Sequence, residues 1–179
     1  SGSINIPDYI TSIADFAFSG CCNLENINFH NHIASIGENA FYDCQNLTFI
    51  NLPDSVEQIN DGAFSDCENL TSIKLPANIT SINKETFHGC KSLKNITLPN
   101  RLESIGEEAF AYCESLAKIV IGESVISIGK GAFACYNLIK VIWNAINCSD
   151  LDKGDKSIFG PYTDVIFNIK SFEFGDLVQ

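Results

Sequence analysis

Apolar residues recur along this chain at a fixed interval of 23 residues, and three columns of them run in phase. The phenylalanine column contains Phe18, Phe41, Phe64, Phe87, Phe110 and Phe133. The isoleucine column contains Ile13, Ile36, Ile59, Ile82, Ile105 and Ile128. The cysteine column contains Cys21, Cys44, Cys67, Cys90 and Cys113. Repetition at such a period predicts a solenoid, in which each unit contacts only its neighbours along one axis.

One unit, residues 55–76, shows how the polar positions divide it. Ile73 and Leu75 alternate with Ser72 and Lys74, which predicts a short strand with one buried face. Residues 56–59 predict a second short extended segment. The residues between the two segments must turn the corner, because they are too few for more than one turn of helix.

We therefore predict a β-rich solenoid of six to seven 23-residue coils, with a parallel sheet on one side and short turns or 3-10 segments on the other. One coil cannot bury its apolar groups alone, so the neighbouring coils must cover them. The sixth coil lacks one residue between Phe133 and Leu138, which shifts Cys135 out of its column.

The regular repeats end near Trp143, and the following residues are more polar. We predict a regular solenoid over residues 1–143. Residues 144–179 are expected to form an irregular seventh coil with a loop insertion, followed by the start of a further repeat. Ile158-Phe159 resembles the Ala-Phe pair of the earlier coils.

The shared pattern I-x-x-x-x-A-F-x-x-C-x-x-L-x-x-I-x-L-P resembles the BspA-like class of leucine-rich repeats, strongly over residues 4–143 and more loosely to residue 179. It departs at Phe29-His30, which replaces Leu-Pro, and at Thr86, which replaces Ala. The resemblance implies a right-handed solenoid whose L-x-x-I-x-L strands form a concave parallel sheet. It also implies a secreted or cell-surface protein of a host-associated microbe that functions in adhesion and has no catalytic residues.

The formal net charge is −11, from 22 acidic and 11 basic residues. This balance argues against nucleic-acid binding and against electrostatic docking on anionic lipid. No apolar run approaches the ~20 residues that cross a bilayer, so we expect no membrane insertion by this chain. Because it lacks methionine and its repeat is already running by Ile6, we expect it to be a piece of a longer array.

The strand alternation predicts which side chains line the exposed side of the sheet, two per coil. These twelve positions are Asn26, Asn28, Phe49, Asn51, Ser72, Lys74, Asn95, Thr97, Lys118, Val120, Lys140 and Ile142. They include three lysines and no carboxylate, and Phe49 is the type of residue that anchors partners. An alternative explanation is that acids are kept off a parallel ladder because stacked like charges repel. The candidate ligand-binding residues are Phe49, Asn51, Ser72, Lys74, Asn95, Thr97, Lys118, Val120, Lys140 and Ile142.

Two functions are compatible with these features. The first is a protein-interaction module that binds a host or microbial protein, such as an extracellular-matrix or cell-surface protein, through the concave sheet. The alternative is a structural spacer that presents another domain of the parent protein. A third hypothesis, the specificity arm of an enzyme, depends on the rest of the reading frame.

Eight cysteines in a chain of this size suggest disulfides, but their columnar spacing argues against them. Stacked repeats point equivalent side chains in parallel, which is the wrong geometry for the disulfide torsion. We predict a reduced, inert ladder of buried thiols. Cys22 and Cys148 lie outside the column and are the two candidates for reactivity.

Other chemistry-bearing residues form no convincing site. His30 and His32 lack the third ligand that zinc requires. The group Asp150, Asp152 and Asp155 lacks the spacing of an EF-hand. We expect no metal, no cofactor and no enzymatic activity. The N-x-[ST] triplets, which would matter in a eukaryotic secreted protein, begin at Asn46, Asn69, Asn78, Asn95 and Asn147.

Overall fold

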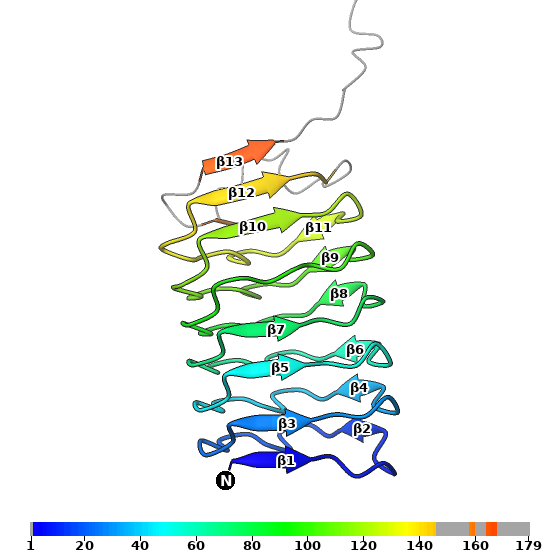
Figure 1. Cartoon of the computed structure of the whole chain (residues 1–179). Coiled ribbons are helices and arrows are strands. Elements are labelled where there is room, and N and C mark those ends of the chain that lie inside the picture. Colours follow the sequence, from blue (N-terminus) through cyan, green and yellow to red (C-terminus); the bar gives the residue numbers. More distant parts are fainter. Residues whose placement is uncertain (1, 146–157, 160–163, 168–179) are drawn as a thin grey trace, which may run out of the picture.

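The computed structural model describes residues 2–145, 158–159 and 164–167, and these form a stack of coils (Figure 1). Each coil contributes to one or both of two columns of parallel strands, and no helix occurs among the described residues. The predicted β-solenoid is therefore confirmed.

The first column, here called the long-strand column, runs up the front of the stack in Figure 1. Its members are β1 (Ser3–Asn5), β3 (Asn26–Asn28), β5 (Phe49–Asn51), β7 (Ser72–Lys74), β10 (Lys118–Ile121), β12 (Lys140–Trp143) and β13 (Asp164–Phe167). Paired residues are one repeat apart: Ile50 pairs with Ile73, and Ile119 with Val141 where the sixth coil is one residue shorter.

The second column consists of two-residue strands that carry the isoleucine column. These are β2 (Ser12–Ile13), β4 (Ser35–Ile36), β6 (Gln58–Ile59), β8 (Ser81–Ile82), β9 (Ser104–Ile105) and β11 (Ser127–Ile128). In each of them the isoleucine is buried. Two residues are enough because the next coil supplies the pairing partner on the same register.

The prediction of a strand in every coil is wrong at the fourth coil. Asn95 makes a single bridge to Ser72, and Thr97 lies outside any strand. Ile96 and Leu98, which occupy core positions of the pattern, are only half-buried. The coil is therefore packed less tightly against the core here, and the long-strand column is interrupted between β7 and β10.

The corner after each short strand is a chain of tight turns rather than a 3-10 helix. In the third coil, the N–H groups of Ala63, Ser65 and Cys67 each donate to the carbonyl three residues before them. The alternate N–H groups, those of Gly62, Phe64 and Asp66, donate to the next coil at 2.7–3.0 Å. Every N–H from Gly62 to Cys67 thus has a partner, within the coil or along the axis, as buried backbone requires.

Two residues of each regular corner have left-handed backbone, four positions apart, which interrupts any helical run. One set is Phe16, Asn39, Gly62, Glu85, Glu108 and Gly131, with φ between 50° and 65°. The other is Gly20, Asp43, Asp66, Gly89 and Tyr112, with φ between 56° and 70°. Glycine, asparagine and aspartate tolerate this conformation, whereas glutamate, phenylalanine and tyrosine rarely adopt it.

A single stack of phenylalanine rings runs through the core along the axis. Successive rings of the phenylalanine column lie 5.2–5.8 Å apart between centroids, with interplanar angles of 6–19°. Phe159 continues the stack at 5.8 Å from Phe133, so Ile158-Phe159 occupies the Ala-Phe position of a seventh coil. Offset stacking at this distance is a favoured arrangement of aromatic rings.

Replacing Phe64 by alanine is expected to lower the free energy of unfolding by about 3–5 kcal/mol. The ring is fully buried between Phe41 and Phe87, and coils tied on both sides cannot collapse into the void. Chemical denaturation measures the loss. Phe49→Ala, at a ring that is 48% exposed, is the matched control and should change stability by less than about 0.5 kcal/mol. Equal effects would contradict the inward assignment of the phenylalanine column.

Candidate ligand-binding face

The exposed side of the long-strand column, here called the long-strand face, carries all ten candidate residues. In β5, Phe49 and Asn51 point outward on either side of the buried Ile50, and in register with them stand Ser72 and Lys74 of β7. Most of the ten side chains are exposed, whereas Ser72 and Ile142 are half-buried. The alternation of the sequence thus identified which side chains face outward, including Asn95 and Thr97 at the interrupted coil.

Two further candidate pairs lie in β10 and β12. Lys118 stands in register with Lys140, and Val120 with Ile142. Like charges placed directly opposite each other on neighbouring strands repel, so this pair of lysines is not explained by strand pairing. Two lysines and two branched apolar side chains thus stand next to one another on the part of the long-strand face that β10 and β12 form.

The lysines of the long-strand face differ from two lysines near the corners, Lys84 and Lys91. Lys84 lies 3.3 Å from a carboxylate oxygen of Glu85, and Lys91 lies 2.8 Å from one of Glu68. Lys74 and Lys118, by contrast, make no ion pair with any residue that the structure describes. Lys74 and Lys118 are therefore free to pair with the carboxylates of a partner.

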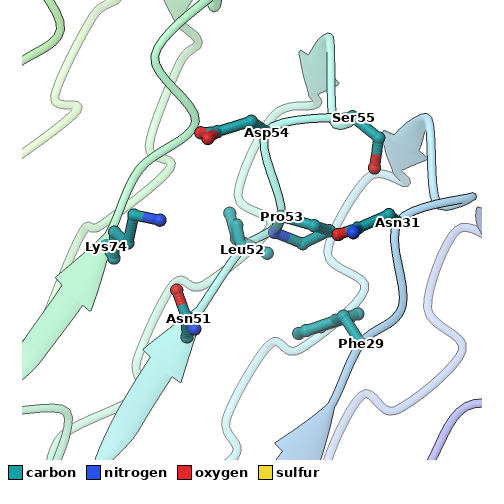
Figure 2. A pocket seen from close by; sticks show the side chains of 8 residues that line it. All are labelled: Phe29, Asn31, Asn51, Leu52, Pro53, Asp54, Ser55 and Lys74. Atoms are coloured by element: carbon teal, nitrogen blue, oxygen red, sulfur yellow. The ribbon is translucent and has the colours of Figure 1, made fainter.

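A hollow of about 290 Å³ lies beyond the ends of β5 and β7 (Figure 2). Its lining residues are Phe29, Asn31, Asn51, Leu52, Pro53, Asp54, Ser55 and Lys74. Two candidate residues, Asn51 and Lys74, thus meet other polar groups there. The hollow offers mainly amide, carboxylate and ammonium groups beside a few apolar side chains, which suits a polar side chain or a peptide turn.

The residues on the first-coil side of this hollow were not among the candidates. Phe29 is half-buried and packs edge-on to Phe41, with centroids 6.2 Å apart. Asn31 completes that side. The signal that could have found them is the departure of Phe29-His30 from the Leu-Pro of the repeat.

The buried cysteines form a hydrogen-bonded ladder. The Sγ of each donates to the carbonyl oxygen of the phenylalanine in the preceding coil, at 2.8–3.2 Å. Phe64, for example, accepts both the N–H of Cys67 and the thiol of Cys90. Cys135 still reaches the carbonyl of Phe110 although its corner is one residue shorter. Its shift out of the sequence column therefore does not remove it from the ladder.

Burial suppresses thiolate formation along this ladder. It raises the pKa of Cys44 from 9.0 to about 12 and raises the pKa values of Cys67, Cys90 and Cys113 as well. Because the thiolate is the nucleophile and metal ligand, these thiols are unreactive. All seven cysteines in the described part of the chain are free; Cys22 is exposed, and Cys148 lies outside the described residues.

The two histidines of the first coil are occupied by the protein itself. The Nε2 of His30 lies 2.9 Å from the carbonyl oxygen of Pro7, and its Nδ1 accepts the N–H of His32 at 3.2 Å. Neither ring nitrogen of His30 is therefore free to bind a metal. Within the described residues, no group of three histidine, cysteine, aspartate or glutamate side chains could hold one. The group Asp150, Asp152 and Asp155 lies outside these residues.

Four of the five asparagines that begin N-x-[ST] triplets lie in the described part of the chain. Asn46, Asn69, Asn78 and Asn95 are exposed, and Asn147 is not described. The side-chain amide of Asn69 donates to the carbonyl of Gln45 at 2.8 Å. Over the described ranges, no helix is long and apolar enough to cross a membrane.

A family model of the BspA type leucine rich repeat region matches residues 2–85 and 57–160, with six copies. The chain belongs to this family. No match was found among the curated proteins.

Solved structures of leucine-rich-repeat proteins are similar to this BspA-type chain. A Treponema pallidum leucine rich repeat protein is 31% identical, with a TM-score of 0.51, over 79% of this chain and 58% of that one. A Bacteroides ovatus leucine-rich repeat protein is 27% identical, with a TM-score of 0.48, over 78% and 48%. The pneumococcal vaccine antigen PcpA is 22% identical, with a TM-score of 0.58, over 80% and 45%. The chain thus spans about half the length of these proteins.

The raised thiol pKa values predict that this BspA-type solenoid loses stability in alkali. Below pH 9 the thiol of Cys44 is protonated in both the folded and the unfolded protein. Between pH 9 and about pH 12 this thiol ionises in the unfolded protein only. Unfolding is then favoured as the pH rises. The stability difference between wild type and Cys44→Ala should therefore shrink by roughly 1.4 kcal/mol between pH 8 and pH 10, measured by denaturation at each pH. A constant difference would contradict the assignment, and Cys22→Ala, at an exposed thiol, is the control.

Thiol titration tests the ladder directly. In denaturant we expect all eight cysteines to react as free thiols. In the native protein Cys22 should react fast, because it is exposed, while the five buried thiols, from Cys44 to Cys135, should react only on unfolding. Substantially fewer than eight thiols in denaturant would show that disulfides form.

Proposed function

We propose that this chain is a protein-interaction module of a cell-surface or secreted protein, which adheres to a host or microbial protein through its long-strand face. Leucine-rich-repeat proteins are in general protein-interaction modules, and the stacked repeats give them extended binding surfaces. The location and the adhesive role are those associated with the BspA-like family.

The observation that carries the proposal is the set of side chains exposed on the long-strand face. Phe49 leaves 48% of its surface exposed on a rigid strand, next to the hollow beyond Asn51 and Lys74. Lys74 and Lys118 have no ion pair among the described residues. A partner that covers Phe49 and supplies carboxylates to the two lysines would gain an aromatic anchor and two charge pairs.

The rigidity of the face favours binding. Its side chains stand on strands that hydrogen-bond to their neighbours along the axis, so little backbone freedom remains to be lost on association. The same rigidity also supports the alternative function, a spacer that holds another domain of the parent protein. A spacer needs the stiffness alone, whereas a binding module also needs the particular side chains.

A binding screen against immobilised extracellular-matrix and plasma proteins tests the proposal. The variant Phe49→Ala, Lys74→Glu, Lys118→Glu should lose binding that the wild type shows. The matched control is Tyr9→Ala, Arg101→Glu, Lys130→Glu, which makes the same charge change at exposed residues outside the long-strand face. Equal loss in both variants would show non-specific charge attraction. Binding unaffected by the first variant, or absent from the wild type, would contradict the assignment and favour the spacer.

A further inference from the structure

A second row of exposed side chains runs along the corners, separate from the long-strand face. Tyr42, Tyr112 and Tyr136 are 40%, 45% and 61% exposed. His88 lies between them in the fourth coil. Each of these residues belongs to a different coil, so the row extends parallel to the axis of the stack.

The rings of the upper half of this row contact one another. The imidazole of His88 meets Tyr112 edge-on, with centroids 5.1 Å apart and an interplanar angle of 70°. Tyr112 in turn lies 6.4 Å from Tyr136 at an angle of 51°. Side chains of three successive coils thus form one continuous aromatic surface.

Carboxylates alternate with the rings. The Nδ1 of His88 lies 3.8 Å from an oxygen of Asp66, and its Nε2 lies 3.8 Å from an oxygen of Glu108. The charge of Asp66 also raises the pKa of the Tyr42 hydroxyl. The row, here called the corner strip, consists of Tyr42, Asp66, His88, Glu108, Tyr112 and Tyr136.

Neither the core nor the backbone gives a reason for tyrosine at position 112. Its φ is 58°, and the equivalent residues of the earlier coils are Gly20, Asp43, Asp66 and Gly89. Glycine is free of strain in this conformation, whereas a tyrosine is disfavoured. The ring is also largely exposed and fills no part of the core. An aromatic side chain held at a strained, exposed position indicates a role in binding.

We propose that the corner strip binds an extended, arginine-bearing segment of a partner protein. Guanidinium groups stack on tyrosine faces and pair with carboxylates, and the corner strip alternates these two features. The net charge of −11 favours a cationic partner, and the lysines of the long-strand face place a different chemistry there. The two faces therefore select partners of opposite charge.

The length of the strip sets the length of the segment. Coils stack about 4.8 Å apart, so the four steps from Tyr42 to Tyr136 span roughly 20 Å. An extended peptide rises about 3.3 Å per residue, so roughly six residues cover the strip.

Fluorescence anisotropy with labelled octapeptides tests this site. We expect (Ala-Arg)4 to bind and (Ala-Glu)4 not to bind. Tyr112→Gly should weaken the binding of (Ala-Arg)4 about two- to fivefold, which is the contribution of an exposed cation–π contact. Because glycine suits the backbone at this position, the unfolding midpoint of this variant should not fall, so weaker binding cannot be attributed to misfolding.

Two controls separate the strip from general acidity and from the long-strand face. Glu108→Gln should weaken binding more than Glu103→Gln, which removes one charge from the same coil outside the strip. Phe49→Ala should bind (Ala-Arg)4 as the wild type does. The proposal is overturned if (Ala-Arg)4 does not bind, if Tyr112→Gly binds it unchanged, or if the two glutamate variants lose equal affinity.

Discussion

The stack of one phenylalanine ring per coil is the constraint on which the rest of the structure depends. The rings are nearly parallel and lie 5.2–5.8 Å apart, so each ring from Phe41 to Phe133 is covered on both faces by the rings of the neighbouring coils. A slip of one residue in the third coil would replace Phe64 in this stack by the small Ala63 or the polar Ser65. The strands, the corners and the cysteine ladder must therefore all repeat with the same period. The carbonyl that accepts each thiol belongs to one of these phenylalanines, which ties the ladder to the stack.

This constraint leaves the outward positions free to differ from coil to coil. On the long-strand face, Phe49 of one coil has a serine as its neighbour in the next, and Val120 faces Ile142. At the corners, Tyr112 occupies a place where other coils have glycine or aspartate. The two exposed surfaces therefore carry different chemistry on a common scaffold, with unpaired lysines on one and carboxylates with aromatic rings on the other.

The sequence was sufficient for the parts that repeat. The period of 23 residues and the alternation around Ile73 predicted the stack, the buried columns and the outward direction of the ten candidate residues. It was insufficient where the outcome depends on contacts between coils. The left-handed backbone of Glu85 and Glu108 is not indicated by glutamate itself, only by the asparagine and glycine that other coils have at this position. His88 has partners in two neighbouring coils, Asp66 and Glu108, which its position in the sequence does not indicate. The interruption at Asn95–Leu98 keeps the apolar pattern of a strand and still lacks the ladder.

The sixth coil shows which parts of a repeat determine the fold and which are free to carry function. It is one residue shorter, yet Phe133 remains in the ring stack and Cys135 still donates to the carbonyl of Phe110. The chain is shortened between Phe133 and Cys135, and the N–H of Cys135 donates to the carbonyl two residues before it rather than three. The following turn keeps its length, and Tyr136 in it adds a ring to the corner strip. Substitutions and deletions on the surface cost little as long as the inward columns are kept. The proposed partner recognition therefore rests on the exceptions to the repeat, such as Phe29, Phe49 and Tyr112, because the consensus positions hold the coils together.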